Sequence, residues 1–408
     1  MTLSEELNWR GFVNQTTYKE ISALDGDPIA FYWGVDPSAD SMTVGNLAIA
    51  MMVRHFVDYG HKAILLVGGA TGLIGDPDGK SEERSLKSTQ EVENNKQKIA
   101  EQYKVIFSGQ DFTIVDNYDW FKEMGYLEFL RDVGKHVPLR QMLARDFVQK
   151  RLGEDGNGIS YAEFSYSLIQ GYDFLHLHKE YNVALQVCGA DQWGNSIAGV
   201  ELIRRISGHE AHVWSAPLVV NKTTGVKFGK SESGAIWLDP VKTNPITEFY
   251  QFWLNTDDDG VEGYLKIYTL LNKKEIQDIV DAFNQDRSNR LAQKTLAFEV
   301  TKLVHGQEIA EKAREYAENL ANSKIGSDGT SPLRIVVSAG TNLVDVLVET
   351  GLATSKTEAR QIISDRGVYI NDVQVNKESI ENEDFVDGIL HLRRGKKIQN
   401  TRIVELKR

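Results

Sequence analysis

The sequence predicts an α/β fold with a doubly wound parallel sheet, followed by an α-helical domain and a small α+β domain. One observation is a strand–helix–strand succession over residues 29–67. Another is the stretch 262–321, where apolar residues recur at helical spacing and no strand pattern interrupts them. The third is the segment 323–331 (SKIGSDGTS), which is typical of a flexible linker between domains.

The strand–helix–strand succession indicates a βαβ unit. Residues 29–35 (IAFYWGV) are β-branched and aromatic, residues 45–59 have helical periodicity, and residues 63–67 (AILLV) form a second buried strand. A further strand is predicted at residues 183–189, followed by a helix at residues 196–206. Because parallel strands are joined by right-handed crossovers, these units predict a Rossmann-like sheet. Its ligands are expected beyond the carboxyl ends of the strands, where the strand order reverses.

The last part of the chain predicts a small α+β module. Residues 341–365 fit two short helices, and residues 368–375 (VYINDVQV) fit a strand–turn–strand with Asn371 and Asp372 at the turn. The predicted division of the chain is 1–225 for the sheet domain, 226–325 for the helical domain, 326–335 for a linker and 336–408 for the small domain.

Composition excludes several classes of protein. The chain has 408 residues, of which 41% are hydrophobic and 25% charged, so it is neither a disordered nor a fibrous protein. A single cysteine, Cys188, excludes an intrachain disulfide. No apolar run approaches the ~20 residues that span a bilayer, and the N-terminus shows no secretory signal. We therefore expect a cytoplasmic protein without a membrane partner.

Charge is unevenly distributed. The net charge is −12, yet the last eighteen residues carry Arg393, Arg394, Lys396, Lys397, Arg402, Lys407 and Arg408 against one acid, Glu405. The plain interpretation is a solvated surface tail. The alternative is a patch that contacts phosphates.

Three motifs carry polar groups suited to chemistry, although each alone also fits a structural role. Residues 68–76 (GGATGLIGD) follow a strand, where glycine lets the backbone approach a ligand, but the Gly-Lys-Ser/Thr of a phosphate loop is missing. Lys227 and Lys230, in residues 226–231 (VKFGKS), could stabilise charge on a leaving pyrophosphate, or form an exposed lysine loop. Tyr166, Gln170 and Asp173 share one helical face, which could line a pocket or face solvent.

In combination the motifs are specific. The succession YWGVDPSAD, VGGATGLIGDP, EFSYSLIQGYDF, GADQWGN and KFGKS strongly resembles the bacterial tyrosyl-tRNA synthetases, a class I aminoacyl-tRNA synthetase family. The resemblance covers nearly the whole chain and includes VDNYDW at residues 115–120 and LRRGKK at residues 392–397. The glycine and lysine motifs alone would indicate only class I. The polar face of residues 166–173 indicates tyrosine.

The resemblance implies a tyrosine site. Tyr32 and Asp173 would bind the phenolic hydroxyl, Asp76, Tyr166 and Gln170 the ammonium group, and Gln192 would lie near the carboxylate. This assignment is physically reasonable, because a carboxylate and two neutral oxygens suit a cation. A buried donor–acceptor pair suits a phenol, and phenylalanine would leave that pair without partners.

The resemblance also implies an ATP site and a catalytic set. The ATP-binding residues would be Gly34, Asp36, Gly45, Asn46, Gly189, Asp191 and Lys230, with Asp191 on the ribose. The catalytic groups would be Lys80, Arg84, Lys227 and Lys230 on the pyrophosphate, together with Ser38, Thr43 and Asn46. Mg²⁺ would enter with ATP, since the sequence shows no all-protein metal site.

The implied reaction has two steps. The tyrosine carboxylate attacks the α-phosphate of ATP, and a terminal ribose hydroxyl of tRNA(Tyr) then attacks the adenylate, so no side-chain nucleophile is needed. The helical region would face the anticodon side, and Arg393, Arg394, Lys396 and Lys397 would neutralise tRNA phosphates. A homodimer is expected from the resemblance.

Two positions depart from the family pattern. The HIGH signature reads TVGN at residues 43–46, where Asn46 can still donate a hydrogen bond but Thr43 is short and cannot be charged. Trp33 replaces a small cysteine and is expected to crowd the ribose. One interpretation is a divergent housekeeping enzyme. The alternative is a tyrosine- and adenylate-binding paralogue with weakened or lost tRNA charging, either regulatory or an inhibitor-resistant second copy. The retained tyrosine face and lysines favour an enzyme.

Overall fold

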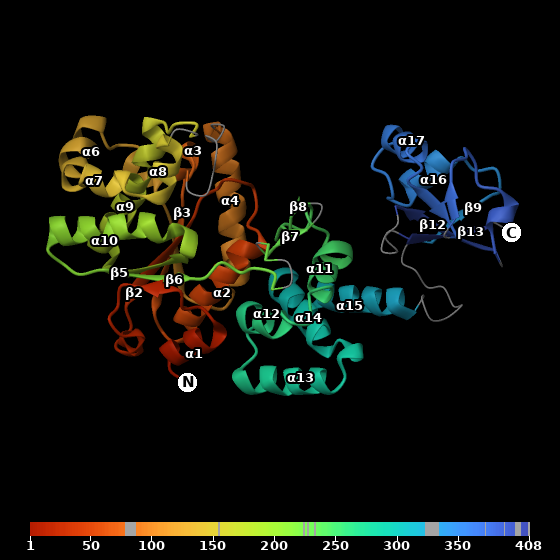
Figure 1. Ribbon diagram of the computed structural model, residues 1–408, viewed down its shortest axis with the longest axis horizontal. Helices are drawn as coiled ribbons and strands as arrows, with labels where there is room; N and C mark the ends of the chain where they lie inside the picture. Colours follow the sequence, from red (N-terminus) through yellow and green to blue (C-terminus); the bar gives the residue numbers. More distant parts are fainter. Residues whose placement is uncertain are drawn as a thin grey trace. The chain divides into compact units, whose positions relative to one another are not determined.

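Two compact units make up the chain, Met1–Glu311 and Lys312–Arg408 (Figure 1). The computed structural model describes residues 1–77, 87–153, 156–222, 225–226, 228–231, 234–322, 334–371, 373–386, 388–395 and 401–406. The predicted linker segment 323–331 therefore lies outside the described residues.

A six-stranded sheet forms the centre of the first unit. Its order is β1 (Gln15–Thr16), β6 (His212–Ala216), β5 (Val183–Gly189), β2 (Ala30–Val35), β3 (Lys62–Val67) and β4 (Phe112–Asp116). The strands from β6 to β4 are parallel, and only the short edge strand β1 is antiparallel. From β2 the chain adds β3 and β4 on one side and then β5 and β6 on the other. The strand order thus reverses between β2 and β5, which confirms the predicted doubly wound sheet.

Helices cover both faces of this sheet, and successive side chains of β2 pack on helices of opposite faces. Phe31 packs on Phe56 of α2 (Val44–Asp58), and Trp33 on Tyr103 of α4 (Thr89–Ile106). Tyr32 points the opposite way and packs on Phe174 of α9 (Tyr161–Tyr181). The next helix, α10 (Trp193–Ser207), packs closely along α9.

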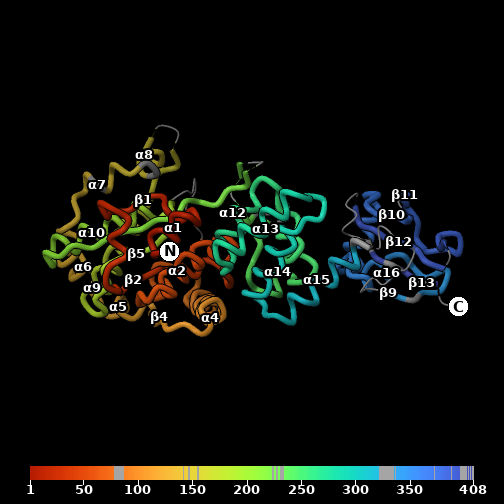
Figure 2. Tube along the Cα trace, turned by 90° about the horizontal axis from the view of Figure 1, so that it is seen from below, coloured from red at the N-terminus to blue at the C-terminus, as the bar shows by residue number. Residues whose placement is uncertain are grey.

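The other helices of the first unit are of two kinds: short helices before and between the strands, and a run of helices that follows the last strand of the sheet in the chain. The short ones are α1 (Leu3–Arg10), α3 (Thr71–Ile74), α5 (Tyr118–Phe121), α6 (Tyr126–Asp132), α7 (Leu139–Leu143) and α8 (Asp146–Leu152). After the hairpin β7 (Lys230–Ser231) and β8 (Gly234–Ala235) come α11 (Tyr250–Leu254), α12 (Val261–Tyr268), α13 (Lys273–Gln285) and α14 (Leu291–His305). The next helix, α15 (Gln307–Asn322), begins in the first unit and lies mostly in the second. Figure 2 shows α12, α13 and α14 lying together. The helical prediction for this stretch is confirmed.

Arg10, the last residue of α1, connects this N-terminal helix to the end of α12. Its guanidinium donates to the carbonyls of Lys266 (2.7 Å), Thr269 (3.1 Å) and Leu271 (2.7 Å), which follow one another at the end of α12. Its Nε pairs with Glu6 at 2.6 Å. These contacts lie within one compact unit, which spans both the predicted sheet domain and most of the predicted helical domain.

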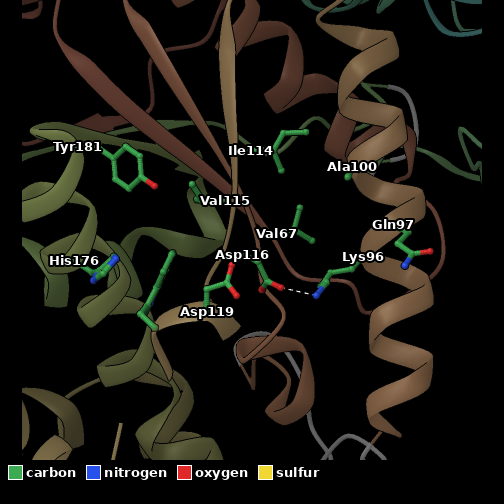
Figure 3. A pocket seen from close by; sticks show the side chains of 11 residues that line it. Val67, Lys96, Gln97, Ala100, Ile114, Val115, Asp116, Asp119, His176 and Tyr181 are labelled. Carbon is green, nitrogen blue, oxygen red and sulfur yellow. Dashed lines mark hydrogen bonds and ion pairs between the residues drawn. The ribbon is translucent and has the colours of Figure 1, made fainter. Parts of the chain in front are cut away.

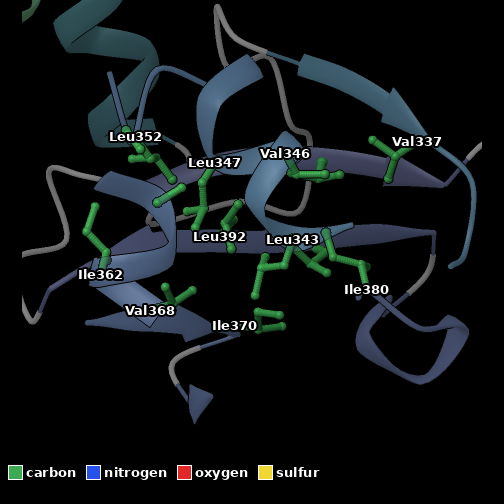
Figure 4. Close-up of a cluster of buried hydrophobic side chains, with 14 residues drawn as sticks. Val337, Leu343, Val346, Leu347, Leu352, Ile362, Val368, Ile370, Ile380 and Leu392 are labelled. Carbon is green, nitrogen blue, oxygen red and sulfur yellow. The ribbon is translucent and has the colours of Figure 1, made fainter. Parts of the chain in front are cut away.

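Besides most of α15, the second unit contains a five-stranded sheet with two helices. The order is β11 (Val373–Val375), β10 (Val368–Ile370), β12 (Ile389–Arg394), β13 (Thr401–Leu406) and β9 (Arg334–Val337), with only β13 and β9 parallel. Helices α16 (Leu343–Glu349) and α17 (Lys356–Ser364) pack apolar side chains onto it (Figure 4). Both predicted helices and the strand–turn–strand are confirmed, and Asn371 at the turn has the positive φ of 47°. Asp372 lies outside the described residues.

The expectation of a solvated basic tail is wrong for the described basic residues of this segment, because they lie in strands β12 and β13. Strand β12 includes Arg393, whose guanidinium stacks over the ring of Tyr369, and Arg394, which pairs with Glu358 at 2.8 Å. Arg402 of β13 donates to the carbonyl of Thr350. Apolar and polar residues alternate only over residues 390–393 (LHLR), a short strand signal that the charge pattern concealed. Lys396, Lys397, Lys407 and Arg408 lie outside the described residues.

Candidate active site

A cavity of about 600 Å³ opens at the carboxyl ends of β2 and β5, where the strand order reverses. It is lined by every predicted tyrosine- and ATP-site residue whose side chain the structure describes, and by Ser38 and Thr43. These are Tyr32, Gly34, Asp36, Ser38, Thr43, Gly45, Asn46, Asp76, Tyr166, Gln170, Asp173, Gly189, Asp191 and Gln192. Residues from five separate segments thus meet at the place where the topology predicts a ligand.

The side chains of the four predicted basic residues lie outside the described part of the chain, so their place at this cavity stays a prediction. Lys80, Arg84 and Lys227 lie outside the described residues, and of Lys230 only the backbone in β7 is described. Their neighbours are informative, because Phe228 lines the cavity. Gly229 has a φ of +91°, and a Cβ there would lie 2.4 Å from Val44 Cγ2. The backbone at Gly229 therefore packs directly on the first turn of α2.

The deep end of the cavity holds a buried acceptor beside a buried hydroxyl. Asp173 accepts hydrogen bonds from Asn117 Nδ2 (3.1 Å) and Trp120 Nε1 (2.9 Å). Burial raises the pKa of the Asp173 carboxyl well above its usual range. Burial and then the nearby Asp173 raise the pKa of the Tyr32 hydroxyl, which has no hydrogen-bond partner among the described residues. A ligand hydroxyl placed here would give that buried group its missing partner.

The middle of the cavity is suited to a cation. The Tyr166 hydroxyl donates to Asp36 at 2.6 Å, so its oxygen lone pairs stay available to accept from a ligand. Gln192 donates to Asp76 at 2.5 Å and accepts from Asn195 at 3.2 Å, which fixes the orientation of its amide. Asp76 and Tyr166, which carry acceptor oxygens, line the same cavity as Gln170. This arrangement favours an ammonium group.

The glycine run 68–76 mainly has a structural role. A Cβ on Gly68 would lie 2.2 Å from both Asp36 Oδ1 and Thr71 Oγ1, and one on Gly69 would lie 2.3 Å from Asp116 Oδ1. The two glycines therefore let polar side chains of neighbouring strands approach the backbone. Asp76, at the end of the run, is the residue that lines the cavity.

The nucleotide end contains the two departures from the family pattern. Trp33 lines the cavity, yet only 4% of its surface is exposed. Its ring packs against Tyr103 with the ring centres 5.4 Å apart. Part of the indole thus packs on the α4 side of the sheet, while the expected crowding of the ribose by Trp33 stays a prediction. Thr43 and Asn46 lie side by side at the start of α2 and are hydrogen-bonded to each other.

Three important residues carried no predicted role. Asn117 and Trp120 hold Asp173, and Asn117 also donates to Thr71, whose hydroxyl donates to Asp36 at 2.6 Å. A network of this kind links the deep end to the middle of the cavity. The available signal was position, since residues 115–120 (VDNYDW) span the carboxyl end of a parallel strand.

A second cavity, also of about 600 Å³, lies along the edge strand β4 between α4 and α9 (Figure 3). Lys96 and Asp116 form an ion pair of 2.5 Å in its wall. Trp120 belongs to this wall and stacks on His176, with 4.3 Å between ring centres and 21° between planes. The same indole thus separates this cavity from Asp173.

Two negative findings hold for the described part of the chain. It contains no group of three or more His, Cys, Asp or Glu side chains placed to hold a metal ion. No helix within it has the length and apolarity needed to cross a bilayer.

Comparisons with known proteins agree with this geometry. A family model described as tRNA synthetases class I (W and Y) matches residues 24–322, and one described as the tyrosine–tRNA ligase SYY-like C-terminal domain matches residues 329–400. The tyrosine–tRNA ligase of Staphylococcus haemolyticus is 44% identical over 413 residues, which cover 97% of each protein. Tyrosine–tRNA ligase 1 of Streptococcus thermophilus is 42% identical over 97% of this chain and 98% of that protein.

A solved structure gives the same result. The C-terminally truncated mitochondrial tyrosyl-tRNA synthetase of Aspergillus nidulans superposes with a TM-score of 0.71 at 31% identity, covering 78% of this chain and 94% of that one. Sequence, fold and cavity thus converge, and the chain belongs to the tyrosine–tRNA ligases of the class I tRNA synthetase (W and Y) family.

Proposed function

We propose that the cavity between β2 and β5 activates L-tyrosine with ATP and then transfers the tyrosyl group to the 3′ end of tRNA(Tyr). The observation that carries this proposal is the pairing of buried Asp173 with the unpartnered hydroxyl of Tyr32. A phenol supplies a donor for one and an acceptor for the other. Phenylalanine would leave both without a partner, so this end of the cavity selects for tyrosine.

Orientation of the two substrates carries the chemistry. With the phenol at Asp173 and the ammonium at Asp76, Tyr166 and Gln170, the tyrosine carboxylate points toward Gln192 and the nucleotide end. The N-terminus of α2, where Gly45 and Asn46 line the cavity, suits phosphate oxygens. Asp191, at the end of β5, is placed in the same cavity to accept from the ribose. The carboxylate then attacks the α-phosphate in line, and pyrophosphate leaves.

The leaving pyrophosphate needs positive charge. We assign this role to Lys80, Arg84, Lys227 and Lys230, supported by the packing of Gly229 against Val44 at the start of α2. Mg²⁺ is proposed to arrive bound to ATP as part of the substrate, since Mg²⁺ commonly binds through substrate phosphates and water.

Transfer to tRNA is assigned to the second unit together with the helical region. Arg393, Arg394, Lys396 and Lys397 are proposed to contact tRNA phosphates. Arg394 has a structural role as well, because it pairs with Glu358 and donates to the carbonyl of Leu352. We retain the proposed division into sheet domain (1–225), helical domain (226–325), linker (326–335) and small domain (336–408), except that residues 334 and 335 of the linker belong to β9 of the small domain.

The assembly is proposed to be a cytoplasmic homodimer. Large apolar side chains are exposed along the segment from α6 to α9, namely Tyr126 (62%), Leu127 (79%), Leu139 (59%), Leu152 (53%) and Tyr161 (62%). A second copy of the chain could cover such a surface. Sedimentation or light scattering tests this assignment: a monomer at micromolar concentration would contradict it.

Two assays test the proposed function. In ATP–pyrophosphate exchange, we expect label to enter ATP only when tyrosine is present. In aminoacylation, we expect tRNA(Tyr) to be charged by the same preparation. Exchange without charging would instead indicate the tyrosine-binding paralogue, and the absence of both would contradict the proposal.

A further inference from the structure

Thr43 and Asn46 form a closely bonded pair at the start of α2. Two hydrogen bonds join them at one atom, because Asn46 Oδ1 accepts from the backbone N–H of Thr43 at 3.0 Å and from its hydroxyl at 2.9 Å. A backbone N–H can only donate, so the amide oxygen must face Thr43. The amide oxygen carries no hydrogen, so the hydroxyl is the donor in the second bond as well.

This bonding pattern divides the roles of the two residues. The only hydrogen on the Thr43 hydroxyl is used on Asn46, and it is not free for a phosphate oxygen. The Asn46 amide has its oxygen fixed on one side, which turns its NH₂ group to the other. Both residues line the cavity, so the amide can present two N–H donors to a ligand there.

The surrounding backbone holds the pair in place. Met42 N–H donates to Gln102 Oε1 of α4 at 2.8 Å, and Leu238 N–H donates to the Met42 carbonyl at 2.9 Å. On the other side of Thr43, Val44 N–H donates to the Ile236 carbonyl at 3.1 Å. Thr43 therefore sits on a segment anchored from α4 and from the chain after β8. Such an anchor can orient a neighbouring side chain without further cost during reaction.

We propose that Thr43 is a positioning residue, which acts on ATP only by orienting the Asn46 amide so that its NH₂ group donates to the nucleotide phosphates. This inference rests on the proposed function, because it requires ATP at this end of the cavity. It differs from the expectation that Thr43 itself is one of the catalytic groups. It also explains how a short, neutral residue can serve at this position.

A double-mutant cycle distinguishes direct from indirect action. The variants are Thr43→Val, Thr43→Ser, Asn46→Ala and Thr43→Val combined with Asn46→Ala, all in the full chain. Thr2→Val is the matched control, since Thr2 is the N-cap of α1, its backbone N–H likewise donates to the side chain three residues on, and it does not line the cavity. Tyrosine-dependent ATP–pyrophosphate exchange gives kcat/KM for ATP and KM for tyrosine in each case.

We expect Thr43→Val to lower kcat/KM for ATP by about threefold to tenfold, the effect of one hydrogen bond. Thr43→Ser and Thr2→Val should stay close to wild type. Asn46→Ala should cost about 10²-fold, and in that background Thr43→Val should add little, because the group it orients is absent. KM for tyrosine should not change in any variant, which also shows that each protein is folded around its amino-acid site.

Three results would overturn the inference. The first is an equal loss from Thr43→Val with and without Asn46, which would mean that Thr43 contacts the nucleotide itself. The second is a wild-type rate in Thr43→Val. The third is failure of Thr43→Ser to restore the rate. A wild-type chain without tyrosine-dependent exchange would instead contradict the proposed function on which the inference rests.

Discussion

The burial and hydrogen-bond partners of Asp173 determine which ligand group its carboxyl can bind. Its carboxyl is buried, and Asn117 and Trp120 hold its two oxygens by one hydrogen bond each. These bonds fix the position of the acceptor, while burial makes any unsatisfied oxygen costly. The result is an acceptor prepared for one ligand hydroxyl, next to the Tyr32 hydroxyl that still lacks a partner.

Replacing Asp173 should therefore damage tyrosine activation selectively. We expect Asp173→Ala to lower kcat/KM for tyrosine by about 10²-fold, because the phenol, Asn117 and Trp120 would all lose a buried partner. Thr43→Ala should leave this value nearly unchanged and affect ATP instead. Exchange kinetics at saturating ATP measure both. Comparable losses of tyrosine activation in the two variants would show that Asp173 does not read the phenol.

His55 predicts how stability depends on pH. Burial, reinforced by the charge of Arg10, lowers the pKa of His55 in α2 to about 3, whereas the unfolded chain titrates near 6.5. Below pH 6.5 His55 is protonated in the unfolded state, whereas in the folded state it stays neutral down to about pH 3. The contribution of His55 to the free energy of unfolding is therefore complete above pH 6.5 and falls as the pH decreases toward 3. Between pH 7 and pH 5 this group alone should cost about 2 kcal/mol.

The His55→Leu variant isolates this effect. Its unfolding temperature should fall less between pH 7 and pH 5 than that of the wild type, while His305, with a pKa of about 4, titrates equally in both proteins. Thermal unfolding followed by circular dichroism at the two pH values gives the comparison. An identical pH dependence in both proteins would contradict the assignment.

Periodicity found some site residues and could not find others. Tyr166, Gln170 and Asp173 recur at helical spacing, and all three line the cavity as that spacing predicted. Asn117 and Trp120 lie more than 50 residues before Asp173, and no periodic relation connects them with it. Such partners arise from strand order, which local patterns do not contain. The contact of Arg393 with the ring of Tyr369 also depends on which strands pair, so local patterns could not predict it.

At the scale of elements, α9 and α10 bring the tyrosine face into position by packing closely. A Cβ on Gly199 of α10 would lie 2.8 Å from the Cβ of Phe174, and one on Gly171 of α9 would lie 3.1 Å from Leu202. Glycine on both helices thus permits the approach. Because Phe174 packs on Tyr32, this contact supports the deep end of the cavity.

Gly199→Ala should consequently destabilise the protein. Overpacking costs about 1–3 kcal/mol, which exceeds the gain of about 1 kcal/mol in helix propensity. Gly263→Ala in α12 is the matched control, since nothing lies within 4 Å of its Cβ position, and it should be neutral or stabilising. Thermal unfolding decides between them. A stabilised Gly199→Ala would mean that the two helices are not in close contact.

Strands with a continuous apolar or β-branched run could be predicted from the sequence, whereas partly exposed or charged strands could not. The strands β2, β3 and β5 lie where apolar and β-branched runs placed them, and their parallel pairing confirms the crossover argument. Strand β4 has only one buried residue in five, and β12 contains a histidine and ends in two arginines, so neither shows a clear apolar run. Their identity as strands depends on pairing with distant segments.

At the scale of the whole molecule, the tyrosine and ATP residues belong to the first compact unit. Every described residue that lines the cavity lies before residue 229. A chain that ends at Asn322, the last residue of α15, should therefore keep tyrosine-dependent exchange within a few-fold of wild type. It should lose most tRNA charging, because the basic residues of the second unit are removed.

Parallel exchange and aminoacylation assays on the full and shortened chains measure this separation. Loss of both activities in a folded, shortened chain would show that the second unit contributes to tyrosine activation. Full charging by the shortened chain would show that the second unit does not contact tRNA productively.

The most direct test of the central claim is a crystal structure of the chain with bound tyrosine. We predict the phenolic oxygen within hydrogen-bond distance of both Asp173 and the Tyr32 hydroxyl, with the ammonium group at Asp76 and Tyr166 and the carboxylate toward the start of α2. Tyrosine bound elsewhere, or with its ring in this cavity but its hydroxyl away from Asp173, would contradict the account.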